Sequence, residues 1–338
     1  MTSNASNALA LIRARRALDA AGVPSHVRLE AVSSVTNEVW LTPELVVRIN
    51  LRADQRLRRE AIIAAALPAG IGYPEVVAQG GDLGSDWLIL RRVPGRPLSR
   101  CWPGMTEDER RSAIDQLAAR LRLLHATEAP ESAPLHSTPQ LLDAAGTGAE
   151  AVGRLLVAVE QARDLPHVDA SVIEDVRGLV LDLAPSLTPF VATTLIHGDL
   201  TFENVLWDMS ERRVTAVIDF EWSRAAPSDL DLDVLLRFAA YPQLHVPKEY
   251  EDVTKPGDYL DVPYWLAEAY PEIYDRPGQF ARVRLYALAW DVQELVAHPP
   301  KRPLASLHPA HPWHRMVAML RGTSHLDVLN GTAVPVAR

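Results

Sequence analysis

Two neighbouring stretches decide the fold: residues 194–207, which read TLIHGDLTFENVLW, and residues 214–220, which read VTAVIDF. Each contains a short run of apolar, β-branched residues with an acidic residue near its end, and Asn204 follows Asp199 by five positions. Buried strands deliver polar side chains to a cleft in this way. We therefore expect Asp199, Asn204 and Asp219 to converge beside a bound ligand.

These residue types suit phosphoryl transfer. That reaction needs a divalent metal to neutralise the phosphates, oxygen ligands to hold the metal, and a carboxylate to orient or deprotonate the attacking hydroxyl. Asp199 is the candidate for the hydroxyl, and Asn204 and Asp219 are the candidate ligands of Mg²⁺. His197 has two readings: it orients the loop through a backbone hydrogen bond, or it takes a direct catalytic part.

The spacing resembles a known family. His197-Gly198-Asp199, four further residues, Asn204, and then Ile218-Asp219-Phe220-Glu221 resemble the motifs of the aminoglycoside phosphotransferase family, the small-molecule branch of the kinase-like fold. Protein kinases usually carry Arg between the His and the Asp and Gly after Asp-Phe. Gly198 and Glu221 therefore favour a small-molecule acceptor over a protein.

The resemblance implies an α+β, bilobal fold in which a small antiparallel β-sheet lobe, residues 1–95, binds nucleotide. A larger, mainly helical lobe, residues 96–338, would carry the catalytic loop and the acceptor site. It also implies transfer of the γ-phosphoryl group of ATP or GTP to a hydroxyl of a small molecule, with an antibiotic of aminoglycoside, macrolide, peptide or nucleoside type as the expected acceptor.

The N-terminal residues read as a β-hairpin, with strands at 27–32, 37–41 and 45–49. The resemblance implies that this hairpin covers the nucleotide phosphates and that Ser33 and Ser34 contact them. The alternative is an ordinary polar hairpin. Arg48 stands where kinases have Lys, and Glu60 on the next predicted helix is its expected ion-pair partner. Two unrelated surface charges are the alternative.

Further strands are predicted between residues 76 and 92, and the segment from residue 87 to Gly95 resembles the hinge between kinase lobes. Backbone groups near Arg91 and Val93 would hold the nucleotide base. Thr106 and Glu109 form a capping box that starts a helix ending at His125. Helices are also predicted at 140–163, 169–184 and 279–296, and residues 241–263 are predicted to form a mobile loop.

Composition limits the function classes. Net charge is −9, with 48% hydrophobic and 23% charged residues. This argues against nucleic acid or an anionic membrane as the partner and is compatible with a cationic acceptor. Cys101 is the single cysteine, so a disulfide within the chain and a cysteine-rich metal site are excluded. Neither a signal peptide nor a membrane span is expected, which makes the cytoplasm the expected location.

The sequence leaves some alternatives for the function and for individual residues open. A metabolic kinase for choline, homoserine or a sugar is an alternative function, and so is a catalytically inactive binding protein. Four acidic residues of the helical part are candidates to meet the substrate: Asp229, Asp231, Asp291 and Glu294. The alternative is that Asp229 and Asp233 only cap a helix and hold the catalytic loop. His308, His311 and His314 are read as a packing loop rather than a metal site.

Overall fold

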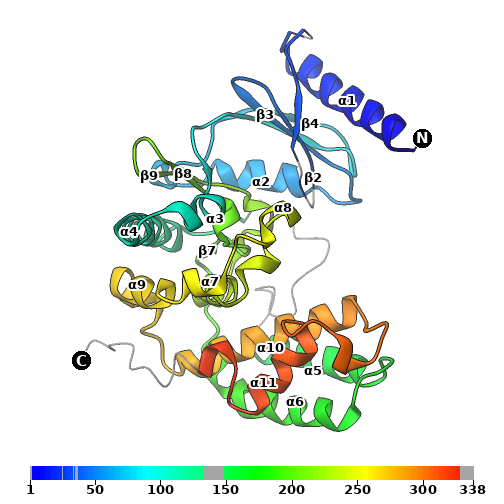
Figure 1. Ribbon diagram of the computed structural model, residues 1–338, viewed down its shortest axis with the longest axis vertical. Helices are drawn as coiled ribbons and strands as arrows, with labels where there is room; N and C mark the ends of the chain where they lie inside the picture. Colours follow the sequence, from blue (N-terminus) through cyan, green and yellow to red (C-terminus); the bar gives the residue numbers. More distant parts are fainter. Residues whose placement is uncertain (1, 25, 33, 35–36, 132–147, 328–338) are drawn as a thin grey trace.

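The computed structural model describes residues 2–24, 26–32, 34, 37–131 and 148–327. An antiparallel five-stranded sheet lies at one end of the molecule and helices make up most of the remainder, which confirms the predicted α+β, kinase-like fold (Figure 1). The sheet has the order β1-β2-β3-β5-β4. Its strands are β1 (Glu30–Val32), β2 (Asn37–Leu41), β3 (Leu45–Asn50), β4 (Val76–Gly80) and β5 (Trp87–Arg91).

The side chains of β3 alternate between the two faces of the sheet. Val47 and Ile49 pack with α1 (Thr2–Ala20) on one face of the sheet. Successive side chains of a strand point to opposite faces, so Arg48 points to the other face, where α2 (Arg56–Ala64) packs through Leu57. The strand thus delivers one guanidinium toward the middle of the molecule.

Two short sheets and the turns beside them hold the two motif stretches. β7 (Leu195–Ile196) pairs with β10 (Arg224–Ala225), and β8 (Val205–Asp208) pairs with β9 (Arg213–Val217) and with β6 (Arg96–Pro97). Residues 197–204 therefore form a loop between β7 and β8, and residues 218–223 a turn after β9. The predicted strand pair around the motifs is confirmed.

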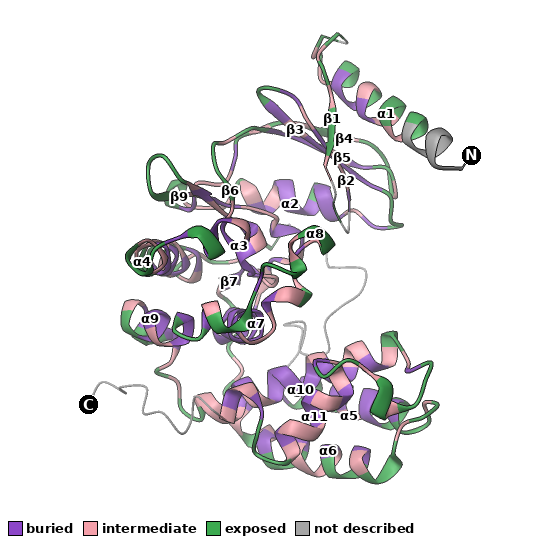
Figure 2. Ribbon diagram, in the orientation of Figure 1, coloured by how far each residue is buried: buried purple, intermediate pink, exposed green. Residues whose placement is uncertain are grey.

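The helices share one large core. Buried side chains lie on the facing surfaces of the helices, and exposed side chains lie outside (Figure 2). The helices are α3 (Leu98–Cys101), α4 (Glu107–His125), α5 (Gly148–Arg163), α6 (Ala170–Leu183), α7 (Asp229–Ala240), α8 (Lys248–Glu251), α9 (Val262–Ala269), α10 (Gln279–Ala297) and α11 (Pro312–Leu320). Among the described helices, none combines the length and the hydropathy needed to cross a bilayer.

Local signals located most elements well. The capping box at the start of α4 is present: the Thr106 hydroxyl accepts from the Glu109 backbone N–H, and the Glu109 carboxylate accepts from the Thr106 backbone N–H. The predicted helix at 169–184 is α6 and that at 279–296 is α10. The helix predicted from residue 140 begins at Gly148 among the described residues, because 132–147 lie outside them.

The mobile loop predicted at residues 241–263 is wrong. This segment contains α8, short 3₁₀ turns and the start of α9, and Tyr259 is buried with its ring stacked on Trp102 at a centroid distance of 5.4 Å. Its prolines misled the prediction: Pro242, Pro256 and Pro263 each occupy one of the first positions of a helical turn. Proline is favoured there because its missing N–H would be unpaired in any case.

Candidate active site

The loop after β7 requires glycine between His197 and Asp199. Gly198 has φ +82°, and a Cβ placed on it would lie 2.4 Å from the Trp222 carbonyl oxygen. Its backbone N–H and that of His197 donate to the two carboxylate oxygens of Asp231, each at 2.8 Å. An acidic side chain at the start of α7 thus fixes the loop's backbone.

Asp231 is itself held by a histidine. His125, at the end of α4, contacts the Asp231 carboxylate through Nε2 at 3.0 Å and the Tyr270 hydroxyl through Nδ1 at 3.0 Å. Burial opposes ionisation of Asp231, but the hydrogen bond and charge of His125 outweigh it and lower the pKa of the carboxyl. Of the acidic residues left open by the sequence, Asp231 is the one that holds the catalytic loop.

His197 is buried and placed to position the loop. Its Nδ1 accepts the Asp199 backbone N–H at 3.3 Å, and its Nε2 lies 2.9 Å from the Ile218 carbonyl oxygen. These contacts assign the neutral tautomer that carries its proton on Nε2, consistent with burial lowering the pKa of His197. The ring therefore joins the loop to the strand that precedes Asp219.

Asp199 and Asn204 are joined within the same loop. The Asn204 side-chain amide donates to the Asp199 backbone carbonyl at 2.8 Å. The backbone carbonyl of Asn204 accepts from the Ile218 backbone N–H at 2.9 Å. Asp199 is half-buried. Burial, followed by the charges of Asp219 and Glu221, raises the pKa of Asp199 to about 7. A carboxylate poised near neutrality can accept a proton from a hydroxyl.

Asp219 is brought to Arg48 from the other motif stretch. Its backbone is left-handed, with φ 66° and ψ 61°, and its carboxylate lies 2.6 Å from Arg48 Nη2. Arg48 also pairs with Glu60 at 2.7 Å, which confirms the predicted ion pair and rules out two unrelated surface charges. Burial raises the pKa of Glu60 to about 7, against the lowering effect of Arg48.

Glu221 belongs to the same group of charged side chains, although the sequence analysis did not name it as a candidate site residue. Its carboxylate accepts from Asn37 at 2.8 Å, pairs with Arg56 at 3.0 Å and lies 3.4 Å from Arg48. The residue was noted only for replacing a kinase glycine. An acidic residue two positions after Asp219, together with the arginine-rich start of α2, is the signal that could have found it.

The oxygen donors here fit a hard divalent cation. Carboxylate oxygens of Glu60, Asp219 and Glu221 lie within 4.8 Å of one another. The side chains of Glu60 and Glu221 are 0% and 2% exposed, whereas that of Asp219 is 28% exposed, so Asp219 faces the open side. Mg²⁺ prefers such oxygen ligands and keeps several waters. Asp219 thus suits the predicted metal role, and the metal role of Asn204 stays a prediction.

The remaining predicted nucleotide contacts are less organised. Ser34 is exposed, and Ser33 lies outside the described residues. The Arg91 side chain is exposed near Glu44 and Glu75, and its backbone N–H already donates to the Glu75 carbonyl at 2.8 Å. Val93 is half-buried in the segment between β5 and β6. The structure therefore brings together Arg48, Glu60 and Asp219, but not Ser34 and the hinge residues.

Comparison with known proteins decides the family. The profile described as the phosphotransferase enzyme family matches residues 28–254, which include every motif discussed above. The chain belongs to the phosphotransferase enzyme family. This confirms the resemblance seen in the motifs.

One curated relative of this chain is an aminoglycoside 3'-phosphotransferase of Streptomyces ribosidificus. It is 34% identical over 171 residues, which are 50% of this chain and 59% of the relative. The alignment thus spans about three fifths of that relative's length.

Two solved structures share the fold. The ADP-bound aminoglycoside phosphotransferase APH(2'')-Ib superposes with a TM-score of 0.57 at 17% identity, over 89% of this chain and 95% of that one. A choline/ethanolamine kinase family protein from Mesorhizobium loti gives 0.60 at 18% identity, over 94% and 98%.

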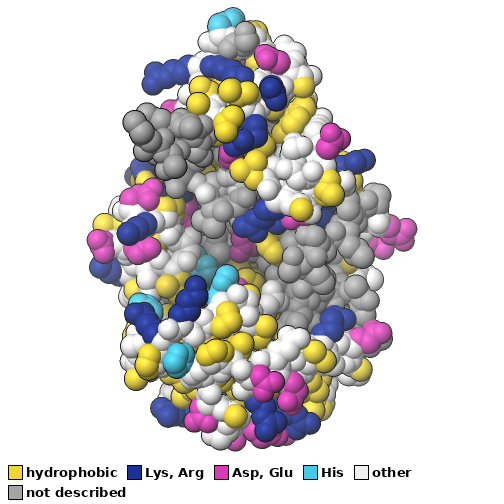
Figure 3. All heavy atoms as spheres, turned by 90° about the vertical axis from the view of Figure 1, so that its right-hand side faces the viewer, with side chains coloured by type: hydrophobic (Ala, Val, Ile, Leu, Met, Phe, Trp, Pro, Cys, Tyr) yellow, Lys and Arg dark blue, Asp and Glu magenta, His cyan; other side chains and the backbone are white. Residues whose placement is uncertain are grey.

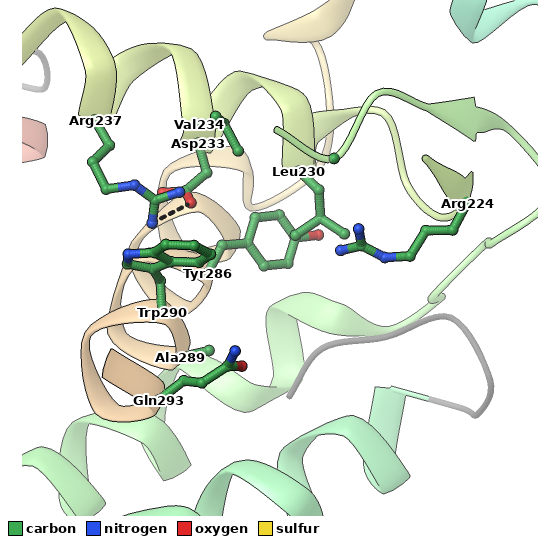
Figure 4. Close-up of a pocket in the computed structure, with 10 residues that line it drawn as sticks. Arg224, Leu230, Asp233, Val234, Arg237, Tyr286, Ala289, Trp290 and Gln293 are labelled. Carbon is green, nitrogen blue, oxygen red and sulfur yellow. Dashed lines mark ion pairs between the residues drawn. The ribbon is translucent and has the colours of Figure 1, made fainter. Parts of the chain in front are cut away.

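A pocket opens beside the loop that contains His197 and Asp199. It is shallow, with a cavity volume of about 40 Å³, and lies between α7 and α10, with Gly198 at its wall (Figure 4). Its charged and aromatic side chains are Arg224, Asp233, Arg237, Tyr286 and Trp290. No motif marks these positions, and the sequence analysis found none of them as an acceptor site.

Asp229, Asp291 and the three histidine candidates have structural partners. Asp229 pairs with Arg282 at 2.5 Å and accepts from the Tyr286 hydroxyl, and Asp291 pairs with Arg315; neither lines the pocket. His308 and His311 accept backbone N–H groups in the turn before α11 and at its start, and His314 contacts the Leu304 carbonyl. These contacts fit a packing role for His311 and His314, whereas His308 is exposed.

Proposed function

We propose that this chain transfers the γ-phosphoryl group of ATP or GTP to a hydroxyl group of a small molecule. One observation carries the proposal: Asp199, a half-buried carboxylate with a pKa raised to about 7, follows Gly198 at the wall of an open pocket and lies near enough to Asp219 for that residue's charge to raise its pKa. A phosphoryl donor on one side and a hydroxyl acceptor on the other would meet at Asp199.

In this proposal each residue has one task. Asp199 orients the acceptor hydroxyl and accepts its proton, while Asn204 and Asp219 hold Mg²⁺. The bound metal supplies positive charge that neutralises the phosphates. Arg48 steadies the phosphates, and Glu60 fixes the direction of Arg48. His197 acts as a positioning residue through its two loop contacts.

The proposed organisation follows the predicted lobes. Residues 1–95 would bind nucleotide, with phosphate contacts from Ser33 and Ser34 and base contacts from the backbone near Arg91 and Val93. Residues 96–338 would bind the acceptor. The relative from Streptomyces ribosidificus is named for an aminoglycoside, which supports an antibiotic acceptor, phosphorylated in the cytoplasm and thereby inactivated.

A metabolic kinase is the second candidate function. The structural neighbour from Mesorhizobium loti is titled as a choline/ethanolamine kinase family protein, and its TM-score is similar to that of the aminoglycoside phosphotransferase. Antibiotic and metabolite kinases would share the residues on the nucleotide side, so the acceptor decides between them.

A nucleotide-consumption assay tests the proposal. Purified protein with Mg²⁺ and ATP or GTP is incubated with a panel of hydroxylated antibiotics and metabolites, and products are identified by ³¹P NMR. We expect consumption that depends on one acceptor class and yields a phosphate ester. Tight nucleotide binding without a phosphorylated product from any acceptor would instead support a catalytically inactive binding protein.

A further inference from the structure

Arg59 is a buried arginine to which the proposed function gives no task. The face of the molecule drawn in Figure 3 carries interspersed acidic and basic side chains. Arg59 instead lies inside the molecule, on α2, and is only 4% exposed. Arginine is seldom buried to this extent without partners, because removing a guanidinium group from water is costly. Its contacts therefore indicate what the side chain does.

Two contacts of Arg59 reach from α2 to the turn that follows Asp219. The Nη1 atom donates to the Glu221 backbone carbonyl at 2.6 Å, and the Nη2 atom donates to the Ser223 backbone carbonyl. A guanidinium group holds its N–H donors in a fixed planar fork. One side chain thus sets the positions of two carbonyl groups that lie two residues apart in the turn.

The turn after Asp219 begins in a conformation that needs support. Asp219 has a left-handed backbone with φ 66°, and a residue other than glycine keeps that conformation only where its surroundings determine it. The next residue, Phe220, donates its backbone N–H to the Glu60 carboxylate at 3.0 Å, which is a further contact with α2. Two adjacent residues of α2, Arg59 and Glu60, therefore hold residues 220–223 from one side.

The same turn borders the catalytic loop. The Trp222 carbonyl oxygen lies so close to Gly198 that a Cβ placed there would be 2.4 Å away. Gly198 precedes the proposed base, Asp199. Trp222 lies between the two residues whose carbonyls bind Arg59. A displacement of the turn would therefore change the placement of Asp219 relative to Asp199, and small misplacements of reacting groups strongly slow transfer.

We infer that Arg59 is a positioning residue for phosphoryl transfer, because it fixes the turn after Asp219 on α2 and so directs the Asp219 carboxylate toward the metal. The inference rests on the proposed function, which assigns the metal to Asp219. Arg59 acts through the backbone of the turn and not through a contact with nucleotide or acceptor. A purely structural arginine would affect stability alone, so metal binding separates the two roles.

Metal binding by two matched variants tests this role. Arg59→Lys keeps the positive charge, but its ammonium group lacks the fork that reaches both carbonyls. Arg120→Lys is the control, because Arg120 donates to the Gln116 and Val214 backbone carbonyls and so joins α4 to β9 instead of holding the turn. The affinity of the full chain for Mn²⁺, used as a probe for Mg²⁺, is measured by electron paramagnetic resonance with ADP bound, and ADP affinity is measured without metal.

The two affinities should respond differently. We expect Arg59→Lys to weaken Mn²⁺ binding about tenfold and to change the metal-free affinity for ADP by less than about twofold. Arg120→Lys should leave both affinities unchanged. Wild-type affinity of folded Arg59→Lys for Mn²⁺, or equal effects of the two variants, would show that Arg59 has only a structural role. The nucleotide-consumption assay on wild-type protein reports on the proposed function separately.

Hydrogen exchange in the wild-type protein is a second test, which holds even if Arg59→Lys does not fold. If α2 holds the turn, the backbone amides of residues 220–223 and those in the middle of α2 should exchange through one common opening, with the same free energy. Turn amides that exchange about tenfold or more faster than those of α2, through an opening of their own, would overturn the positioning role.

Discussion

The nucleotide side and the acceptor side of the site differ in how completely their charges are paired. On the nucleotide side, Glu60, Asp219 and Glu221 all contact Arg48, and Arg56 also contacts Glu221. On the acceptor side, the Asp233–Arg237 pair leaves three buried polar atoms without hydrogen bonds. The first region is organised by the protein's own contacts, while the second keeps bonding capacity for a ligand.

The same two regions differ in how far sequence motifs predict their residues. The nucleotide side is built from short stretches with fixed spacing, so Asp199, Asn204, Asp219, Arg48 and Glu60 could be predicted. The acceptor pocket is assembled from a loop, a short strand and two helices that lie far apart in the sequence. The following predictions test whether the two regions behave as differently as their contacts indicate.

The largest effect is expected at Gly198, where the two regions meet. Gly198→Ala places a methyl group 2.4 Å from the Trp222 carbonyl at φ +82°, so the loop must move. We expect turnover to fall by about 10²-fold or more, since a small misplacement of reacting groups has effects of that size. Gly178→Ala on α6, where a Cβ meets nothing within 4 Å, is the matched control and should keep full activity.

A large effect on stability is expected at Asp231. In Asp231→Asn, one amide N–H₂ replaces an oxygen that accepts a backbone N–H, so a buried donor loses its partner. We expect the free energy of unfolding to fall by about 2–3 kcal/mol, measured by urea denaturation at pH 7.

Exposed Asp182→Asn on α6 is the control and should change the free energy of unfolding by less than about 0.5 kcal/mol. The pKa of Asp231 is lowered from 3.8, so its stabilising effect is present above that value and is lost as the pH falls further. An equal loss in both variants would show that Asp231 does not hold the loop.

A smaller effect, confined to one region, is expected at Arg48. Arg48→Lys keeps the charge but loses the planar fork that contacts Glu60, Asp219 and Glu221 together. Nucleotide affinity should fall about tenfold, while acceptor affinity changes less than about twofold. Arg91→Lys, at an exposed position, should alter neither affinity. Calorimetry that shows a larger change for the acceptor would move Arg48 to the other side of the site.

The pH dependence tests the group between the two regions. Because the pKa of Asp199 is raised to about 7, the carboxyl is protonated below that pH and cannot accept the hydroxyl proton. We expect kcat/KM to fall about tenfold for each pH unit below 7. The residual activity of Asp199→Asn should lack this slope; the same slope in that variant would assign the titration to another group.

Some elements could be predicted accurately from the sequence and others could not. Alternation and the capping box located β2 to β5 and α4 to within a residue or two, because those signals are local. The mobile loop predicted at residues 241–263 was wrong because the prolines of this segment start helical turns. The residue that holds the catalytic loop, Asp231, could not be identified from the sequence, because its contact with His125 joins positions far apart in the chain.

The most direct test of the central claim measures both halves of the reaction in Asp199→Ala, with Asp182→Ala as the control. We predict that Asp199→Ala keeps its nucleotide affinity, because the contacts of Arg48 and Asp219 are intact, and that its phosphoryl transfer falls by about 10²-fold or more, while the control behaves as wild type. Phosphoryl transfer by Asp199→Ala at the wild-type rate would contradict the account.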